Sequence, residues 1–441
     1  MSDIYDKWGF STNPFAQTPL PATKDGAALL VGRDHELNRI RTLMGAQPKL
    51  VTVEGRNGIG KTSIINVAAF DCLQKFLLTN GEAPALLPCG DAFQLTPDID
   101  VDAFVLRVLH RVTIALKKLE EQLKQVGMVS PLLEPLAKWL QDPIISGGSL
   151  GASAFGFGVA AGRTHAANTG DGFKSTGFEV RALEMLTDLF PQGTHGGVVC
   201  VIDNLELMKT SKDARDLVES LRDRILSVPG LRWVLSGALG IVRGIGSTPR
   251  MSGYLHDPVE VGDIPPELSG DILQRRQDFY TFTDKAALPI RPREFQLLYK
   301  VLAGNIRDTL SEADNYCTKI ALDATWSPGD GKEAEMFQEW LKNQCTRRLE
   351  AADRVITARP WKLFDDIIGL GGQTAPGDYN GFGFESQQAM RANVLKLEEA
   401  NLIQSLRDED DNRRKTILVT PNGWMVYYAR SKGLDGLFAD I

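Results

Sequence analysis

The chain has 441 residues, of which 43% are hydrophobic and 24% are charged, and its formal net charge is −7. This length predicts two or three domains, each large enough to bury a core. The acidic balance excludes a globally basic surface, so any contact with nucleic acid has to come from a local patch.

The cysteines are scattered along the chain without a C-x-x-C spacing, which predicts reduced thiols rather than a metal site. The first residues lack the basic and apolar regions of a signal peptide. No uncharged apolar run reaches about 18 residues, the length that a membrane helix needs. The sequence therefore predicts a cytoplasmic protein without a membrane span.

The N-terminal segment Trp8–Phe15 carries aromatic residues around an Asn-Pro pair. This pattern predicts an extended segment pinned onto a domain surface. An apolar run then leads through Gly32 into a helix that ends near Met44, with acidic residues in its first turn, where they suit the helix dipole.

A phosphate-binding loop is predicted next. An apolar run from Leu50 to Val53 leads into Gly-x-x-x-x-Gly-Lys-Thr at Gly55–Thr62, and a helical pattern follows. Glycines let backbone N–H groups turn inward around phosphate oxygens, and the helix N-terminus faces the same anion. In this arrangement Lys61 would reach the β- and γ-phosphates, and Thr62 would place its hydroxyl on Mg²⁺.

The alternative is a glycine turn that happens to end in Lys-Thr, but the strand before the loop and the helix after it favour a site for a nucleoside triphosphate. The residues predicted to bind the nucleotide here are Gly55, Asn57, Gly58, Ile59, Gly60, Lys61, Thr62 and Ser63.

A long insertion, at about residues 90–190, follows the loop, because 142 positions separate Lys61 from Asp203. It contains an amphipathic helix near Val101–Val126. It also contains a segment at 146–177 that is rich in glycine and other small residues. That segment reads as a surface loop, and a pore loop or a partner-binding element is the alternative.

A second apolar run, Val198–Ile202, ends in Asp203 and is typical of a parallel strand buried on both faces. A carboxylate at the carboxyl end of such a strand lies in the crevice where α/β sheets bind ligands, and it can hold Mg²⁺ there. Glu206 is a candidate to polarise an attacking water, and an ordinary acid in the first turn of a helix is the alternative. A third strand, Leu231–Ala238, carries Ser236 near its end.

A helical lid is predicted after a final strand near Val259. Within the lid, Gly304-Asn305 starts a helix, since Asn is a capping residue, and Arg307 falls in the first turn.

The C-terminal part predicts a separate module. Helical patterns cover 351–368 and 386–401, two apolar runs flank a charged tip at 408–415, and a last helix opens at Pro421. This order predicts a winged helix-turn-helix. Arg391, Lys396 and the wing-tip residues 413–415 can contact bases and phosphates, but from residue 385 to 415 six basic residues are opposed by seven acidic ones. Two partners therefore stay open for this module: double-stranded DNA or another protein.

Together, the segment Val31–Leu37, the phosphate loop, the strand ending in Asp203 and the helix start at Gly304–Arg307 resemble AAA+ and STAND P-loop ATPases of the origin-recognition type. They are also similar to bacterial transposition ATPases. The resemblance implies an α/β fold: a P-loop αβα sandwich with a parallel sheet, a helical lid subdomain and a C-terminal winged helix-turn-helix. The corresponding domains would be residues 1–262, 263–345 and 346–441.

The resemblance also implies roles around the nucleotide. The backbone of Val31 and Gly32 would line the base pocket. Ser236 would read the γ-phosphate, Arg307 would lean onto it from the lid, and Arg250 would reach the γ-phosphate of a neighbouring subunit, with Arg243 as the reserve. The catalytic set implied is Lys61, Asp203, Glu206, Ser236, Arg250 and Arg307.

One position departs from the family. Many AAA+ proteins place a glutamate directly after the aspartate, where this chain has Asn204. The implied activity is ATP binding and slow ATP hydrolysis with Mg²⁺, coupled to homo-oligomerisation and to binding of DNA or a protein partner. The alternative is a STAND-type signalling or anti-phage defence NTPase whose winged helix docks protein.

Overall fold

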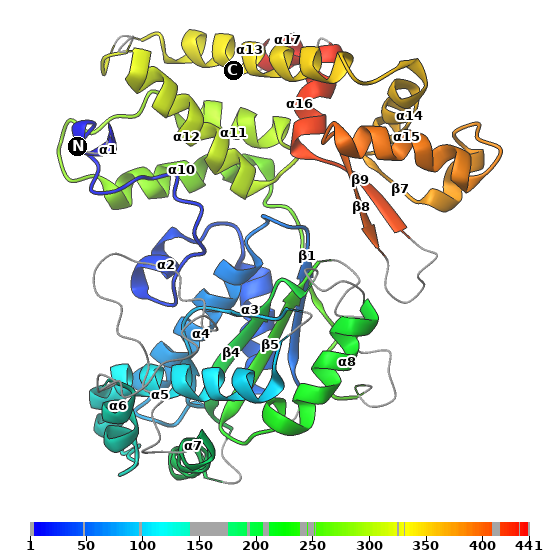
Figure 1. Cartoon of the computed structure of the whole chain (residues 1–441). Helices are drawn as coiled ribbons and strands as arrows, with labels where there is room; N and C mark the ends of the chain where they lie inside the picture. The colour runs from blue at the N-terminus through cyan, green and yellow to red at the C-terminus, as the bar shows by residue number, and fades with distance from the viewer. Residues whose placement is uncertain are drawn as a thin grey trace, which may run out of the picture.

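The computed structural model describes residues 4–46, 49–96, 99–141, 175–191, 195–205, 211–238, 245, 251, 253–323, 326–329, 331–407, 415–431 and 433–439. Figure 1 shows a sheet flanked by helices, a group of helices above it, and a small module with its own sheet beside that group. This is the α/β fold with a helical lid and a C-terminal winged helix that the sequence predicts.

The large sheet is parallel. Its strands are β1 (Val51–Gly55), β2 (Leu86–Pro88), β3 (Phe93–Gln94), β4 (Gly197–Asp203), β5 (Leu231–Gly237) and β6 (Val259–Val261). They follow the order β2-β4-β5-β1-β6, with β3 paired to β4 beside this path. The order places β5 between the strand that opens the phosphate loop and the strand that ends in Asp203. All carboxyl ends meet at one edge, where a ligand crevice is expected.

Helices cover both faces of this sheet. They are α3 (Asp34–Gly45), α4 (Lys61–Leu78), α5 (Val101–Gln125), α6 (Leu133–Gln141), α7 (Ser175–Leu189) and α8 (Ser211–Leu221), which continues into the π-helical turn η2 (Arg222–Leu226). In β4, Val198, Cys200 and Ile202 pack in the core with α5, α7 and α8. Val199 and Val201 pack in the core with α3 and α4. Because both faces are buried, the strands read as continuous apolar runs in the sequence.

The helix predicted near Val101–Val126 is confirmed as α5. Asp100 caps its N-terminus, since its side chain accepts a hydrogen bond from the Ala103 N–H. The residues that make this helix amphipathic are buried: Phe104, Val105, Val108, Leu109, Val112 and Leu116. The glycine-rich segment at 146–177 lies almost wholly outside the described residues.

The lid consists of α10 (Pro266–Tyr280), α11 (Pro292–Val301), α12 (Ile306–Asp323) and the first part of α13 (Glu333–Asp353). Its core also contains side chains from the N-terminal segment, where α1 (Ile4–Lys7) lies: Tyr5, Phe10 and Phe15 are each at most 2% exposed. The short helix α2 (Lys24–Leu29) then precedes α3. The segment up to Phe15 therefore packs in the lid, although the sequence grouped it with the sheet domain. The boundaries at 262 and 345 stay a proposal.

The winged helix follows. Its elements are α14 (Ala358–Gly369), β7 (Gln373–Thr374), the 3₁₀ turn η3 (Pro376–Asn380), α15 (Gln387–Glu399), β8 (Ile403–Arg407), β9 (Lys415–Val419) and α16 (Pro421–Arg430). The last helix, α17 (Leu434–Ala439), packs in the lid core through Leu434. The sheet order is β7-β9-β8, with antiparallel pairs. The helical pattern at 351–368 is not one helix. α13 ends at Asp353 and α14 begins after Thr357, which places Pro360 in a first turn, where proline is tolerated.

Among the residues that the structure describes, no helix is both long and apolar enough to span a membrane.

Candidate functional site

The phosphate loop connects β1 to α4 at the carboxyl edge of the sheet. Gly58 and Gly60 have φ angles of 80° and 99°, a left-handed conformation that side-chain-bearing residues rarely adopt. Gly60 is the N-cap residue of α4. The loop therefore turns back on itself and presents the N-terminus of an 18-residue helix to the space above the sheet.

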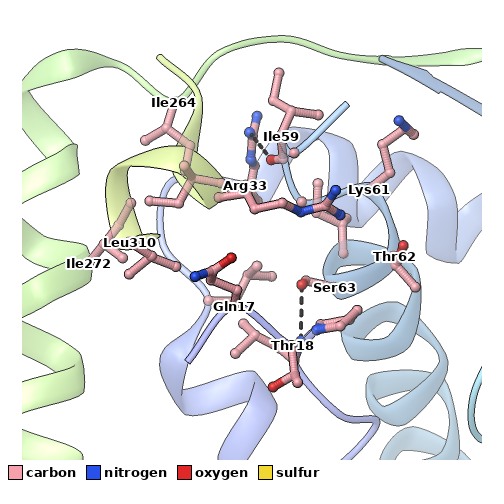
Figure 2. Close-up of a pocket in the computed structure, with 18 of the residues that line it drawn as sticks. Gln17, Thr18, Arg33, Ile59, Lys61, Thr62, Ser63, Ile264, Ile272 and Leu310 are labelled. Atoms are coloured by element: carbon pink, nitrogen blue, oxygen red, sulfur yellow. Dashed lines mark hydrogen bonds between the residues drawn. The ribbon is translucent and has the colours of Figure 1, made fainter. Parts of the chain in front are cut away.

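A cavity of about 300 Å³ lies in that space (Figure 2). The phosphate loop, the N-terminal segment 17–20, the segment before α3, the end of β4 and the lid all contribute to its walls. Ten residues assigned from the sequence line it: Val31, Asn57, Gly58, Ile59, Gly60, Lys61, Thr62, Ser63, Asp203 and Arg307.

The two ends of the cavity differ in chemistry. In Figure 2, Lys61 and Thr62 lie on one side, and Ile272 and Leu310 of the lid lie on the other. The apolar end also includes Val31 and other aliphatic side chains. A planar apolar group therefore fits at the lid end, and an anion fits at the phosphate-loop end.

Lys61 is 7% exposed, and its Nζ donates to the carbonyl oxygens of Gly55 at 2.9 Å and Arg56 at 3.2 Å. Beside it, the Thr62 hydroxyl donates to Oδ2 of Asp203, which is also 7% exposed. The other carboxylate oxygen of Asp203 accepts from the Asn204 N–H at 2.9 Å. The hydroxyl and the carboxylate that were assigned to Mg²⁺ from the sequence are thus in direct contact.

The first turn of α12 rests on the phosphate loop. The Arg307 N–H donates to the Gly58 carbonyl at 3.2 Å, and Nδ2 of Asn305 donates to the Asn57 carbonyl at 3.3 Å. Asn305 also caps α12, as predicted, because its Oδ1 accepts from the Asp308 N–H. The lid is therefore closed onto the backbone carbonyls of the loop, through one backbone N–H and one side-chain amide.

A second contact between loop and lid comes from Arg56. Its guanidinium donates to Asp263 and, at 2.9 Å, to the Ala303 carbonyl. Ala303 has a φ of 50°, so the turn that leads into α12 is held in a strained conformation beside this contact.

Arg33 was not assigned a role from the sequence. It is 3% exposed and donates to the carbonyls of Gly262 at 2.7 Å and Ile59 at 3.0 Å, the latter shown in Figure 2. It also pairs with Glu36 at 3.0 Å. Arg33 thus ties the phosphate loop to the end of β6, where the chain leaves the sheet for the lid.

Three assigned residues do not line the cavity: Gly32, Gly55 and Ser236. Ser236 is fully buried at the end of β5, and its hydroxyl has no hydrogen-bond partner among the described residues. A contact with a phosphate would require this side chain to rotate or β5 to shift. Glu206, Arg243 and Arg250 lie outside the described residues.

The sequence interpretation missed the wall that the N-terminal segment and α10 supply, which includes Gln17, Thr18 and Arg276. One signal was present. Ile272, Leu273 and Arg276 share a face of α10 at helical spacing, so an arginine stands in the apolar stripe of that helix. A charged residue at such a position indicates a buried polar partner.

Gly58 allows a test of the contact between loop and lid. A Cβ at this position would lie 2.5 Å from Oδ1 of Asn305, in addition to the strain of the positive φ, whereas a Cβ on Gly60 would meet nothing within 4 Å. We expect Gly60→Ala to lower the free energy of unfolding by about 1–2 kcal/mol through strain alone, and Gly58→Ala to lower it further. Urea denaturation measures both, with Gly45→Ala as the control, because Gly45 lies in open space.

Asn305→Ala removes the atom that a Cβ on Gly58 would meet at 2.5 Å, but it also removes the cap of α12, so it is measured alone as well as together with Gly58→Ala. Gly58→Ala should lower the free energy of unfolding less in the Asn305→Ala background than in the unaltered chain. If Gly58→Ala and Gly60→Ala unfold at the same urea concentration, the lid does not rest on the loop in solution.

The exposed face of α15 is the candidate nucleic-acid surface. Arg391 and Lys396 are exposed on it, together with Gln387 and Gln388, while Met390, Val394 and Leu397 of the same helix are buried. Leu395 is also 44% exposed on this helix. The wing tip at 408–414 lies outside the described residues.

No protein-family model matches the chain, and no curated protein matches it. Similar solved structures are those of the Aeropyrum pernix ORC1 protein in complex with DNA (14% identity, 93% of this chain and 94% of that chain, TM-score 0.40) and the Aeropyrum pernix ORC2 protein in ADPNP–ADP complexes (11% identity, 98% of both chains, TM-score 0.43).

Another is the Drosophila ORC bound to DNA, at 13% identity over 97% of this chain and 92% of that chain, with a TM-score of 0.39. These proteins are of the origin-recognition type that the sequence motifs resemble. With identities and TM-scores this low, the chemistry of the site has to be inferred from this chain's own residues.

Proposed function

We propose that the chain is an AAA+-like switch that binds and slowly hydrolyses ATP. The observation that carries this proposal is the convergence of three features on one cavity: the phosphate loop, the contact between Thr62 and Asp203, and the first turn of the lid helix α12. A glycine turn that binds no ligand would need neither the contact between Thr62 and Asp203 nor the first turn of α12.

The cavity suits a nucleoside triphosphate in both size and polarity. The base fits the apolar end beside Val31, Ile272 and Leu310. The phosphates then lie against the N-terminus of α4, where Lys61 supplies a cation and the loop supplies backbone N–H groups.

Thr62 and Asp203 would hold Mg²⁺, which would take the place of the direct hydrogen bond between them. Among the described residues there is no cluster of three or more His, Cys, Asp or Glu side chains that could hold a metal by themselves. A magnesium ion held by one hydroxyl and one carboxylate, with phosphate oxygens and waters as its other ligands, is the arrangement that Mg²⁺ favours in nucleotide sites. When bound, the ion neutralises the charge that develops on the phosphates.

For hydrolysis, the proposal keeps the roles assigned from the sequence. Arg307 supplies a lid cation to the γ-phosphate, Ser236 acts as a hydroxyl sensor, Glu206 orients the attacking water, and Arg250 completes the site of a neighbouring copy of the chain. Arg307 has the strongest support, since it lines the cavity and its own N–H already contacts the loop.

The coupling to the winged helix follows from packing. α13 contributes Phe337 to the lid core and Ala352 to the winged-helix core, and α16 contributes Met425 to the first and Val426 to the second. A lid that moves on binding or loss of the γ-phosphate would therefore carry the winged helix with it.

Isothermal titration calorimetry with ATP, ADP and GTP, with and without Mg²⁺, tests the proposal directly. We expect ATP to bind more tightly with Mg²⁺, and light scattering to show a larger assembly with a non-hydrolysable ATP analogue than with ADP. A folded protein that binds no nucleotide at millimolar concentration would refute the assignment.

We propose DNA as the partner of α15. Replacing Arg391 and Lys396 by alanine should lower the slope of log K against log salt by up to about two contacts, or roughly 1.8. Fluorescence anisotropy with double-stranded DNA measures this slope. The control is Lys118→Ala/Lys138→Ala, because both lysines are exposed on the sheet domain.

The second candidate is a STAND-type signalling NTPase whose winged helix docks a protein. The exposed Leu395 in the middle of α15 favours it, because an apolar side chain on this face suits a protein surface better than phosphates. Absence of any salt-sensitive DNA binding by the ATP-bound protein would support this candidate over the first.

A further inference from the structure

The N-terminal segment crosses from the lid to the sheet domain beside the nucleotide cavity. On the lid side, Asn13 donates through Nδ2 to Asp314 of α12 at 3.1 Å, and Phe15 is buried in the lid core. On the sheet side, the Leu20 N–H donates to Oγ of Ser63 at 3.0 Å, and the Leu20 carbonyl accepts from Nδ2 of Asn66 at 2.9 Å. One end of the segment is thus fixed to the lid and the other to the sheet domain.

Arg276 of α10 holds the middle of this segment. Its guanidinium donates to the carbonyls of Pro14 at 2.8 Å and Ala16 at 3.0 Å, and the residue is only 6% exposed. Among the residues that the structure describes, its buried Nε has no hydrogen-bond partner and no carboxylate pairs with its guanidinium. Burial lowers the pKa of this guanidinium. A buried cation that is bound only to two backbone carbonyls indicates that positioning this backbone is its role.

Between the two anchors, Gln17, Thr18 and Pro19 line the cavity, and Figure 2 shows Gln17 reaching into it opposite the phosphate loop. Ala16 and Leu20 are four Cα–Cα steps apart, so a fully extended chain spans at most about 14 Å between their Cα atoms. The lid therefore has a second covalent link to the sheet domain, besides the one that leaves β6. The lid can open widely only if this segment detaches from the lid or from α4.

We infer that residues 13–20 form a tether that retains the nucleotide by limiting lid opening, and that Arg276 is the positioning residue that holds the tether to the lid. The inference rests on the proposed nucleotide site and adds to it a control of nucleotide release. Release becomes faster when the Arg276 bonds break, because the backbone at Pro14 and Ala16 can then leave α10 and the link between the lid and Leu20 lengthens.

The test is stopped-flow dissociation of mant-ADP, a fluorescent ADP, chased with unlabelled ADP. Arg276→Met keeps the apolar packing and removes both bonds, so we expect the dissociation rate to rise about tenfold or more. Arg276→Lys retains a charged donor, so its mant-ADP dissociation rate should lie between those of the unaltered protein and Arg276→Met. Gln274→Met is the matched control, because Gln274 is exposed on the same helix and its side chain donates to Asp278 of that helix. A folded Arg276→Met protein that releases mant-ADP within twofold of the unaltered rate would overturn the inference.

The opposite anchor provides a second variant if Arg276→Met does not fold. Asn66→Ala removes the bond to the Leu20 carbonyl and should speed release several-fold. An unchanged rate in this variant counts against the tether. Failure of the unaltered protein to bind mant-ADP would instead refute the nucleotide site.

If the unaltered protein does not bind mant-ADP, hydrogen exchange of the backbone amides still tests the tether. The amides of Ala16 and Leu20, which donate to Asn13 and Ser63, should exchange faster in Arg276→Lys than in the unaltered chain. Equal exchange would overturn the tether independently of any nucleotide.

Discussion

Replacing Lys61 by alanine is expected to weaken ATP binding by about 100-fold or more. The Lys61 ammonium is almost fully buried at the start of α4 and lines the cavity where the β- and γ-phosphates would lie. A hydrogen bond to a charged group contributes about 1.5–3 kcal/mol. The β- and γ-phosphates would each lose one such bond in the variant. Isothermal titration calorimetry with ATP, at equal ionic strength for both proteins, measures the change.

Lys61 also donates to two carbonyls of its own loop, so the variant has to be shown to be folded. Circular dichroism and a thermal transition supply that check. Lys75→Ala is the matched control, because this lysine is exposed in the last turn of the same helix. Unchanged ATP affinity in folded Lys61→Ala protein would show that the cavity does not hold a triphosphate in the proposed orientation.

The parallel sheet and its loop could be predicted because their signals are local. The run Val198–Ile202 is apolar at every position since both of its faces are covered, and Asp203 follows directly. The phosphate loop needs glycines at fixed positions, and Gly58 and Gly60 have the positive φ angles that explain them. Asn305 likewise reveals the start of α12, because capping is an interaction between residues three positions apart.

The wall formed by residues 13–20 could not be predicted in this way. Arg276 lies about 260 positions from the carbonyls it binds, and carbonyl oxygens leave no trace in the amino-acid sequence. The same holds for Arg33, whose partners are the backbone oxygens of Gly262 and Ile59. A motif shows which side chains would meet a ligand, but it does not show which backbone segments other side chains hold in place.

The N-terminal segment also shows why the sequence grouped residues incorrectly around the lid. Trp8–Phe15 was expected on a domain surface, and its aromatic residues do pack against a domain. That domain is the lid, however, some 260 residues further along the chain, and Phe10 forms a bridge with Thr281 there. The segment precedes the phosphate loop in the sequence, which favoured the sheet domain. The hydrophobic effect is non-directional, however, so an apolar segment can pack against elements that lie far away in the sequence.

Asp203→Asn is expected to lower Mg²⁺-dependent ATP hydrolysis on the order of 100-fold while changing metal-free ATP binding only a few-fold. The asparagine oxygen can still accept the Thr62 hydroxyl, so the contact that joins β4 to α4 survives. The charge that would hold the metal is lost, and a metal ion at a developing phosphate charge contributes several kcal/mol. The turnover number is measured over a titration of Mg²⁺, and the binding constant is measured in EDTA.

The matched control is Asp34→Asn, an exposed carboxylate at the start of α3 that faces no metal in this proposal. It should leave both the turnover number and the Mg²⁺ midpoint unchanged. Glu206→Gln distinguishes the role proposed for Glu206 from that of Asp203. Loss of a residue that orients water lowers the turnover number without moving the Mg²⁺ midpoint. If Asp203→Asn hydrolyses ATP at the unaltered rate and with the same Mg²⁺ midpoint, then the metal is held elsewhere, and the contact between Thr62 and Asp203 only joins two elements of the sheet domain.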